Sequence, residues 1–213
     1  MTRRSDLRGL YAITDSLLAT RETLDRQVEE ALEGGAAVIQ YRDKSGDNDR
    51  RFREASSLRR LCDGAGALLI INDDVELARL TGADGVHLGR DDGGVPAARM
   101  ALGPRAVIGV SCYNQFHRAQ MAQEAGADYV AFGRFFPSAT KPEAVQAGRD
   151  LLERSRRDLA VPTVAIGGIT PENGRALIAA GADMLAVVHG LFGQPDIRAA
   201  CLTFTRLFDH SED

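Results

Sequence analysis

A short motif recurs along the chain and restricts the folds that it can adopt. Gly-Ala-Asp occurs at residues 82–84, 126–128 and 181–183, and an apolar run follows each copy. Residues 34–36, Gly-Gly-Ala, form a degenerate copy before another apolar run. Glycine often ends a helix, so each copy predicts a helix end, a short turn and a buried strand. Recurrence of such a unit predicts a repeated helix–turn–strand architecture.

Eight apolar runs alternate with helical segments. They lie at residues 10–13, 36–39, 67–71, 85–88, 106–110, 129–132, 162–166 and 184–188. Between them we expect helices that include residues 24–32, 49–63, 75–80 and 95–102, one that begins at Thr170-Pro171, and one after Pro195. Continuous apolar strands that alternate with helices predict a parallel sheet covered by helices. The count of eight predicts an α/β fold, a single-domain (β/α)8 TIM barrel over residues 1–213. The alternative is an open doubly wound sheet, but no dinucleotide-binding glycine fingerprint follows the first run.

Polar residues are concentrated after these runs. In a barrel the carboxyl ends of all strands converge on one mouth. The side chains expected there are Thr14, Asp15, Gln40, Arg42, Lys44, Asn72, Asp73, Arg90, Asp91, Asp92, Ser111, residues 133–141, Gly167, Gly168, His189 and Gly190. The strand starts carry little beyond the aspartate of the repeat. This asymmetry predicts a functional site at the mouth.

The segment Gln40-Tyr41-Arg42-Asp43-Lys44 is basic on one face. Alternate residues of an extended chain point the same way, so Gln40, Arg42 and Lys44 share a side. Arginine grips phosphate oxygens with a planar fork and lysine with a point charge. The pattern indicates a site for a ligand with several phosphate oxygens. A solvated basic strand end is the alternative.

Two aspartates follow neighbouring strands. Asp73 comes after the third run and Asp92 after the fourth. Carboxylates one strand apart can hold Mg²⁺ together with water and substrate phosphate. Asp74 and Asp91 fit helix caps or solvated loop acids better.

Two further segments indicate a second phosphate site and a lid. Gly167-Gly168 follows the seventh strand and Val188-His189-Gly190 the eighth, where barrels often bind phosphate through backbone N–H groups. Residues 136–141 form a loop with two hydroxyls and Lys141, long enough to close over a ligand; a plain polar loop is the alternative.

Composition excludes several classes of function. The net charge is −4 with a pI near 5.6, which predicts neither nucleic-acid binding nor a membrane-binding basic patch. No run approaches the ~18 apolar residues of a membrane helix. Three scattered cysteines indicate reduced thiols, so a cytoplasmic protein is expected. His87 alternates with apolar residues and is expected to be hydrogen-bonded in the interior. No Cys–His or Ser–His–Asp set for covalent catalysis can be assembled.

The chain resembles thiamine-phosphate synthases over nearly its whole length. The residues that carry the resemblance are 11–15 (Tyr-Ala-Ile-Thr-Asp), 40–44, 70–73, 85–89 with Asp92, 108–111, 137–141 and 165–169. The resemblance implies that 4-amino-5-hydroxymethyl-2-methylpyrimidine diphosphate is coupled to a thiazole-ethyl phosphate. The products would be thiamine monophosphate and diphosphate.

The resemblance also implies roles for individual residues. Those expected to hold the pyrimidine diphosphate are Gln40, Arg42, Lys44, Asn72 and Lys141, with Ser111 beside the pyrimidine. Those expected to hold the thiazole phosphate are Ser138, Thr140, Gly168, Val188 and His189. Tyr41, Asp43 and Ala139 lie within these segments and are counted with the substrate-binding residues. Asp73 and Asp92 would hold Mg²⁺, and Arg42, Lys44 and Lys141 would be catalytic.

The mechanism implied by the family is dissociative. Diphosphate leaves first, and the thiazole nitrogen captures the pyrimidine-methyl cation. The positive groups would stabilise charge that grows on the leaving diphosphate, and the ring amine would stabilise the cation without a protein base.

Some positions depart from the commonest pattern: His189, Ser138, Arg90 and Tyr113. Three alternatives stay open: a thiazole tautomerase, a phosphosugar epimerase or isomerase, and a non-catalytic barrel that binds a phosphorylated metabolite. A homo-oligomer is also possible.

Overall fold

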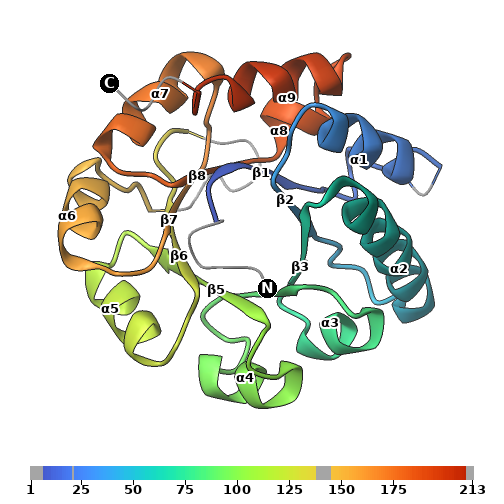
Figure 1. Ribbon diagram of the computed structural model, residues 1–213, viewed down its shortest axis with the longest axis horizontal. Helices are drawn as coiled ribbons and strands as arrows, with labels where there is room; N and C mark the ends of the chain where they lie inside the picture. The colour runs from blue at the N-terminus through green and yellow to red at the C-terminus, as the bar shows by residue number, and fades with distance from the viewer. Residues whose placement is uncertain (1–6, 21, 138–144, 210–213) are drawn as a thin grey trace.

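Eight parallel strands close into a barrel in the computed structural model, which describes residues 7–20, 22–137 and 145–209 (Figure 1). Neighbours in sequence pair with each other, and β1 pairs with β8 to close the ring. The strands are β1 Gly9–Ile13, β2 Val38–Tyr41, β3 Leu68–Asn72, β4 Gly85–Leu88, β5 Val107–Tyr113, β6 Tyr129–Gly133, β7 Thr163–Ile166 and β8 Met184–Val187. The expected (β/α)8 barrel is therefore confirmed.

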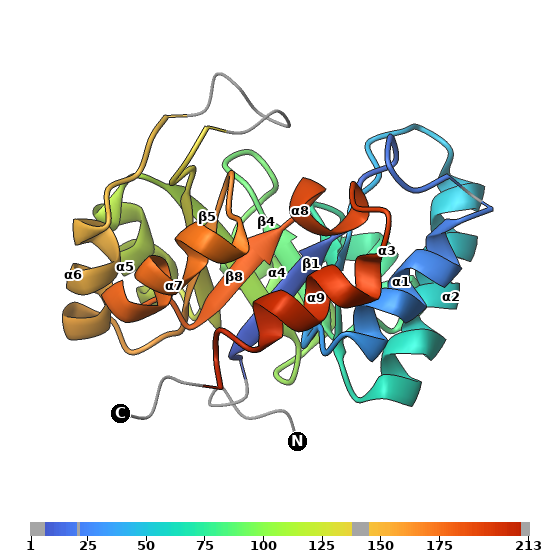
Figure 2. The same cartoon turned by 90° about the horizontal axis from the view of Figure 1, so that it is seen from above.

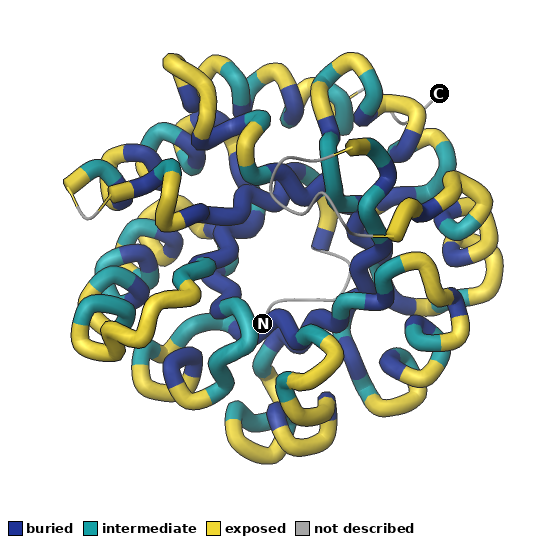
Figure 3. Tube along the Cα trace, turned by 180° about the vertical axis from the view of Figure 1, so that it is seen from behind, coloured by how far each residue is buried: buried dark blue, intermediate teal, exposed yellow. Residues whose placement is uncertain are grey.

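Helices surround the strands and expose only their outer faces, as Figure 3 shows by colour. They are α1 Leu24–Glu33, α2 Asn48–Ala65, α3 Val75–Thr81, α4 Val95–Leu102, α5 Phe116–Glu124, α6 Asp150–Asp158, α7 Pro171–Ala180, α8 His189–Phe192 and α9 Ile197–Thr205. None of the helices in the described ranges is long and apolar enough to span a bilayer.

The helix ends follow the local signals in the sequence. Pro171 opens α7, and the Thr170 amide donates to Asn173 Oδ1 at 2.9 Å in a capping box. Asp74 caps α3 by accepting from Leu77 N at 2.9 Å. Gly82 ends α3 in the left-handed conformation, with φ +64°. The glycine of the repeat thus ends a helix, as predicted.

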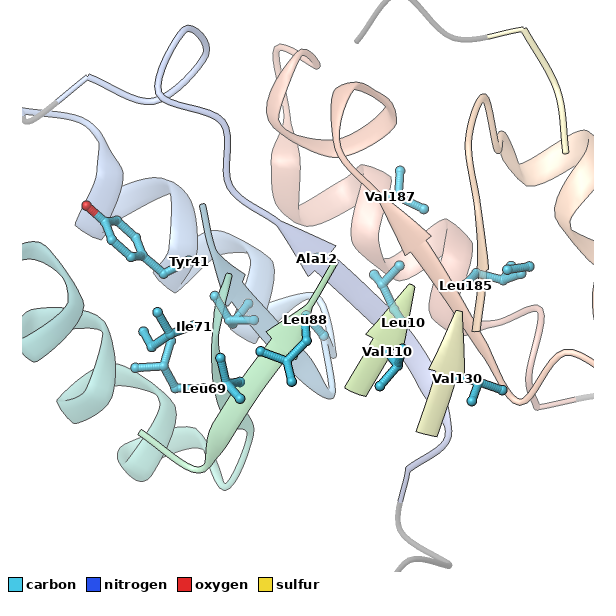
Figure 4. Packing of buried hydrophobic residues seen from close by; sticks show 14 of the residues in the cluster. Leu10, Ala12, Tyr41, Leu69, Ile71, Leu88, Val110, Val130, Leu185 and Val187 are labelled. Carbon is cyan, nitrogen blue, oxygen red and sulfur yellow. The ribbon is translucent and has the colours of Figure 1, made fainter. Parts of the chain in front are cut away.

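Alternation along each strand divides the buried side chains between two layers. On β1, Leu10 and Ala12 pack outward against the helices, whereas Tyr11 and Ile13 face the barrel interior. Figure 4 shows the outer layer, in which Leu10, Leu69 and Leu185 lie between strands and helices. The outer layer stabilises the barrel through apolar burial, which leaves the interior free to carry polar groups.

The aspartate of the repeat fastens the amino ends of alternate strands. Asp84, Asp128 and Asp183 each precede one strand, and each accepts a backbone N–H near the start of the strand before it. The donors are Leu69 at 2.8 Å, Ile108 at 2.9 Å and Thr163 at 2.7 Å. Helix arginines pair with two of these aspartates, Arg59 with Asp84 and Arg99 with Asp128. The repeat is therefore a stabilising device at the end of the barrel away from the mouth.

Three segments differ from the expectation. The second strand lies two residues further along, at Val38–Tyr41, because Gln40 and Tyr41 continue the pairing with β3. The fifth strand extends to Tyr113 through an irregularity after Ser111. The short helix α8 was not expected; it seats Leu191 and Phe192 in the core beyond the end of β8 (Figure 2).

Candidate active site

A cavity of about 490 Å³ opens at the carboxyl end of the barrel. Side chains and backbone from the ends of most strands line it. Among its lining residues are seven expected site residues: Gln40, Arg42, Asn72, Ser111, Gly168, Val188 and His189. Ser138, Ala139, Thr140 and Lys141 lie outside the described residues. The structure thus gathers most of the expected set that it describes around one space.

The basic segment enters this cavity through Gln40 and Arg42. Gln40 is buried, and its Nε2 donates to the hydroxyl of Tyr11 at 2.8 Å. The Arg42 amide donates to Thr14 Oγ1 at 3.0 Å, and its guanidinium lies 3.7 Å from Asp15 Oδ2. The turn after β1 therefore fixes both the backbone and the charge of Arg42 at the mouth.

Tyr41 and Asp43 do not line this cavity; they line a smaller one, which Arg42 lines as well. The Tyr41 hydroxyl donates to Glu54 Oε2 at 2.7 Å, and Figure 4 shows the ring in the outer layer. Burial raises the pKa of Tyr41. Asp43 accepts from Ser45 N at 2.6 Å and pairs with Arg50. Because strand side chains alternate, Tyr41 lies on the opposite face of β2 from Gln40, and a contact of Tyr41 or Asp43 with substrate stays a prediction.

Asp73 and Asp92 meet beside Asn72. Asp73 follows β3 in the left-handed conformation (φ +66°), and its amide donates to His87 O at 2.9 Å. Asp92 Oδ2 accepts from Gly89 N at 2.7 Å. Burial, and next the adjacent Asp92 carboxyl, raise the pKa of Asp73. The predicted neighbourhood of the two carboxylates is confirmed.

This pair has the chemistry of a divalent-cation site. Two hard oxygen ligands in a partly buried place repel each other, and a cation between them relieves that repulsion. Within residues 7–20, 22–137 and 145–209 no group of three or more His, Cys, Asp or Glu side chains could hold a metal. Two carboxylates leave most ligand positions to water and phosphate, which is how Mg²⁺ is usually held.

A chain of hydrogen bonds crosses the floor of the cavity. Gln40 Nε2 bonds Tyr11 OH at 2.8 Å, and Tyr11 OH lies 2.8 Å from Tyr129 OH. His87 Nδ1 lies 3.0 Å from Tyr129 OH, and its Nε2 lies 2.9 Å from Ser111 Oγ. The predicted interior, hydrogen-bonded His87 is confirmed. Sequence reasoning missed the two tyrosines, although tyrosine at an inward strand position was an available signal.

The glycines after β7 allow a close approach of two backbone segments. Gly168 has φ +61°, and a Cβ there would lie 2.3 Å from Pro137 O. Only glycine fits this position without moving Pro137. On the neighbouring strand, Val188 and the exposed His189 begin α8. The expected second phosphate segment thus presents backbone to the cavity.

The rim on the β5 side holds an aromatic ring between two cations. Tyr113 has φ +57°, and the guanidinium carbons of Arg90 and Arg118 lie 5.1 and 5.6 Å from its ring centroid. Such contacts hold arginine over aromatic faces. Arg90 and Arg118 therefore add positive charge to the rim beyond that of the basic segment, which suits anionic ligands.

Comparison with known proteins identifies the family. Residues 10–191 match the thiamine monophosphate synthase family. The chain belongs to this family.

Relatives of the same family cover almost the whole chain. Thiamine-phosphate synthase from Nitrosococcus oceani is 55% identical over 96% of this chain and 94% of its own length. The synthase from Thiobacillus denitrificans is 54% identical over 94% of both chains. The solved thiamine phosphate pyrophosphorylase from Pyrococcus furiosus is 33% identical, with a TM-score of 0.89 and 99% of both chains covered. The protein is therefore a transferase of thiamine biosynthesis.

Proposed function

We propose that this enzyme joins 4-amino-5-hydroxymethyl-2-methylpyrimidine diphosphate to a thiazole-ethyl phosphate, forming thiamine monophosphate and diphosphate. One observation carries the proposal in a chain of this family. Arg42, Asn72 and Ser111 come from three separate strand ends and line one cavity, and the carboxylates of Asp73 and Asp92 lie beside Asn72. The arrangement supports a polyanion-binding site, a cation site and a ring-binding site close together.

The basic segment is the proposed diphosphate site. Gln40 and Arg42 line the cavity, whereas Lys44 is not among its lining residues and lies 3.6 Å from Asp73 Oδ2. Negative charge grows on the diphosphate as its bond to carbon breaks, so positive groups fixed in advance stabilise the transition state more than the ground state. Arg42 is held by Thr14 and Asp15, which lowers the reorganisation needed at that moment. Lys141 is proposed to act with Arg42 and Lys44.

Asp73 and Asp92 are the proposed Mg²⁺ ligands. The bound ion would supply positive charge to the leaving diphosphate. Burial and the neighbouring Asp92 carboxyl raise the pKa of Asp73, so keeping Asp73 ionised costs free energy. A bound cation would remove that cost. Lys44 already provides part of that compensation from 3.6 Å.

The second substrate is proposed to lie on the β7–β8 side. Gly168, Val188 and His189, which line the cavity, are its proposed phosphate contacts, and Ser138 and Thr140 are proposed with them from the family resemblance. The pyrimidine would rest near Ser111, between the two phosphate sites. Bringing both substrates into one cavity supplies the proximity that a bimolecular capture needs.

A coupled assay tests this function. Purified enzyme is given both substrates with Mg²⁺, and thiamine monophosphate and diphosphate are measured together. We expect both products in equal amounts and none in excess chelator. Turnover that persists in chelator contradicts the metal role. Conversion of the thiazole phosphate alone, without coupling, would instead indicate a tautomerase.

A further inference from the structure

The floor of the cavity contains polar side chains where a barrel usually carries apolar ones. Tyr11 and Tyr129 are completely buried, and Gln40 is nearly so. Burying hydroxyl and amide groups is costly unless each finds a hydrogen-bond partner. Here each finds one, and the bonds join into a continuous line from Gln40 to Ser111. The line crosses the barrel, because its members come from β2, β1, β6, β4 and β5 in turn.

A glycine in the barrel wall leaves space for one member of this line, the Tyr129 ring. A Cβ on Gly109 would lie 1.9 Å from Cζ of Tyr129, so the bare backbone of β5 provides the space for the ring. The Tyr129 ring also stacks on the His87 imidazole, with centroids 5.6 Å apart and planes inclined by 24°. Gly109 therefore makes room for a tyrosine whose hydroxyl connects Tyr11 with His87.

One direction of donation uses every hydroxyl hydrogen of Tyr11 and Tyr129 within the line. Gln40 Nε2 is a donor, so the Tyr11 oxygen accepts from it. Either tyrosine can donate in the next bond, and a line in which each hydroxyl donates once within it has Tyr11 donating to Tyr129. In such a line Tyr129 donates to His87 Nδ1, which then carries no hydrogen. A neutral imidazole carries its single proton on Nε2 in that case, and Nε2–H donates to Ser111 Oγ.

We propose that Gln40, Tyr11, Tyr129 and His87 form a one-way hydrogen-bond relay that positions Ser111 to donate its hydroxyl hydrogen into the cavity. Because Ser111 Oγ already accepts from His87, its hydrogen is directed to a lone pair on the bound ring. The recognised group is a ring nitrogen of an aromatic heterocycle. Tyr11, Tyr129 and His87 are positioning residues, since they act through Ser111.

The relay suits the reaction proposed above, on which this role in turnover rests. A neutral hydroxyl can hold a ring nitrogen without transferring a full proton to it. A protonated ring would oppose the positive charge that develops when diphosphate leaves. The relay also connects Gln40, at the diphosphate end, with Ser111 at the ring end.

The tautomer of His87 tests the relay without any substrate. In ¹⁵N-histidine-labelled enzyme, couplings to the ring carbon-bound protons distinguish a proton on Nε2 from one on Nδ1, and His87→Asn assigns the signal. We expect the neutral Nε2–H form. Tyr129→Phe keeps the ring but removes the donor to Nδ1, so the His87 signals should move toward a mixture of tautomers. Tyr41→Phe, another buried tyrosine outside the relay, should leave them unchanged. A proton on Nδ1 in the wild type overturns the proposal.

A double-mutant cycle tests whether the relay acts through Ser111. We expect Tyr129→Phe alone to lower kcat/KM by about tenfold, as the loss of roughly one hydrogen bond does. In a Ser111→Ala background the same change should cost less than about twofold, because the group that it positions is absent. Tyr11→Phe replaces Tyr129→Phe if that variant does not fold. Additive losses, or a lower Tm with an unchanged tautomer, would show a structural role only. If no thiamine phosphate forms at all, the proposed function fails while the tautomer still decides the relay.

Discussion

The ammonium of Lys44 lies 3.6 Å from Asp73 Oδ2, so the last cation of the basic segment contacts one of the two proposed metal ligands. Both side chains are partly exposed, and solvent weakens such a pair. Lys44 can therefore leave Asp73 at little cost, as the proposed binding of a divalent ion at Asp73 and of phosphate at Lys44 would require. This contact links the proposed cation site with the proposed diphosphate site.

Asp73→Asn should stabilise the enzyme without divalent ions while it weakens Mg²⁺ binding. The pKa of Asp73 is raised by burial and next by Asp92. Ionisation of a carboxyl with a raised folded-state pKa costs stability at higher pH. This cost decreases as the pH falls below the folded-state pKa and is absent below the unfolded-state pKa. The variant should thus have the higher Tm at pH 7, with a difference that closes in acid. Asparagine also tolerates the φ of +66°.

Magnesium should then reverse the order of the two Tm values. Mg²⁺ stabilises whichever protein binds it, so it should raise the Tm of the wild type and not that of Asp73→Asn. Asp91→Asn, an exposed neighbour, serves as the control. A fall in Tm for Asp73→Asn at every pH would indicate that Asp73 is needed for folding.

Arg42→Ala should lower kcat/KM by at least ~10²-fold, the loss typical of a group that stabilises transition-state charge. Arg42→Lys should recover part of the rate, because it restores the charge but not the planar fork. Arg26→Ala, on an exposed i,i+4 pair of α1, is the matched control. Steady-state assays with varied pyrimidine diphosphate measure the effect, and a wild-type rate in Arg42→Ala would exclude the grip.

Gly168→Ala should damage the site more than Gly82→Ala. Both glycines have a left-handed φ, +61° at Gly168 and +64° at Gly82. Alanine therefore strains the backbone at both positions by about 1–2 kcal/mol. Only at Gly168 would the new Cβ meet another backbone, at 2.3 Å from Pro137 O. We expect a rise of about tenfold or more in KM for the thiazole phosphate in Gly168→Ala alone. Equal KM values in the two variants would show that Gly168 does not contribute to binding of the thiazole phosphate.

Asp128→Ala should destabilise the barrel far from the mouth. Asp128 Oδ2 accepts from Arg99 at 2.5 Å and from Ile108 N at 2.9 Å, and it is mostly buried. Loss of charged hydrogen bonds of this kind costs about 1.5–3 kcal/mol. Glu76→Ala breaks a largely exposed pair with Arg79 and should change the free energy of unfolding little. Urea unfolding measures the free energy of unfolding of both variants. Similar losses in the two would show that the repeat aspartate does not stabilise the barrel in this way.

Much of the fold could be predicted because its signals are local. A glycine with positive φ ends a helix wherever it stands, and a continuous apolar run is buried whichever strand lies beside it. Gly82 and Pro171 marked helix boundaries within a residue of the structure. The paired aspartates Asp73 and Asp92 were also predictable, since neighbouring strand ends must lie close together.

The parts that were missed depend on contacts between distant segments. The second strand was placed two residues too early along the chain. Its position depends on the pairing of Gln40 and Tyr41 with β3, which no local signal indicates. The short α8 follows from the burial of Leu191 and Phe192, which no local signal indicates.

By itself, the sequence determined that eight strand–helix units form, that polar residues follow the strands, and which side chains of each strand share a face. Only closure of the barrel decided which face is the interior, and so turned Gln40 toward the cavity and Tyr41 away from it. Closure also brought Tyr11 within 2.8 Å of Tyr129, 118 residues further along the chain. Hydrogen bonds are directional and short, so partners this far apart in sequence are fixed only when the whole ring of strands is in register.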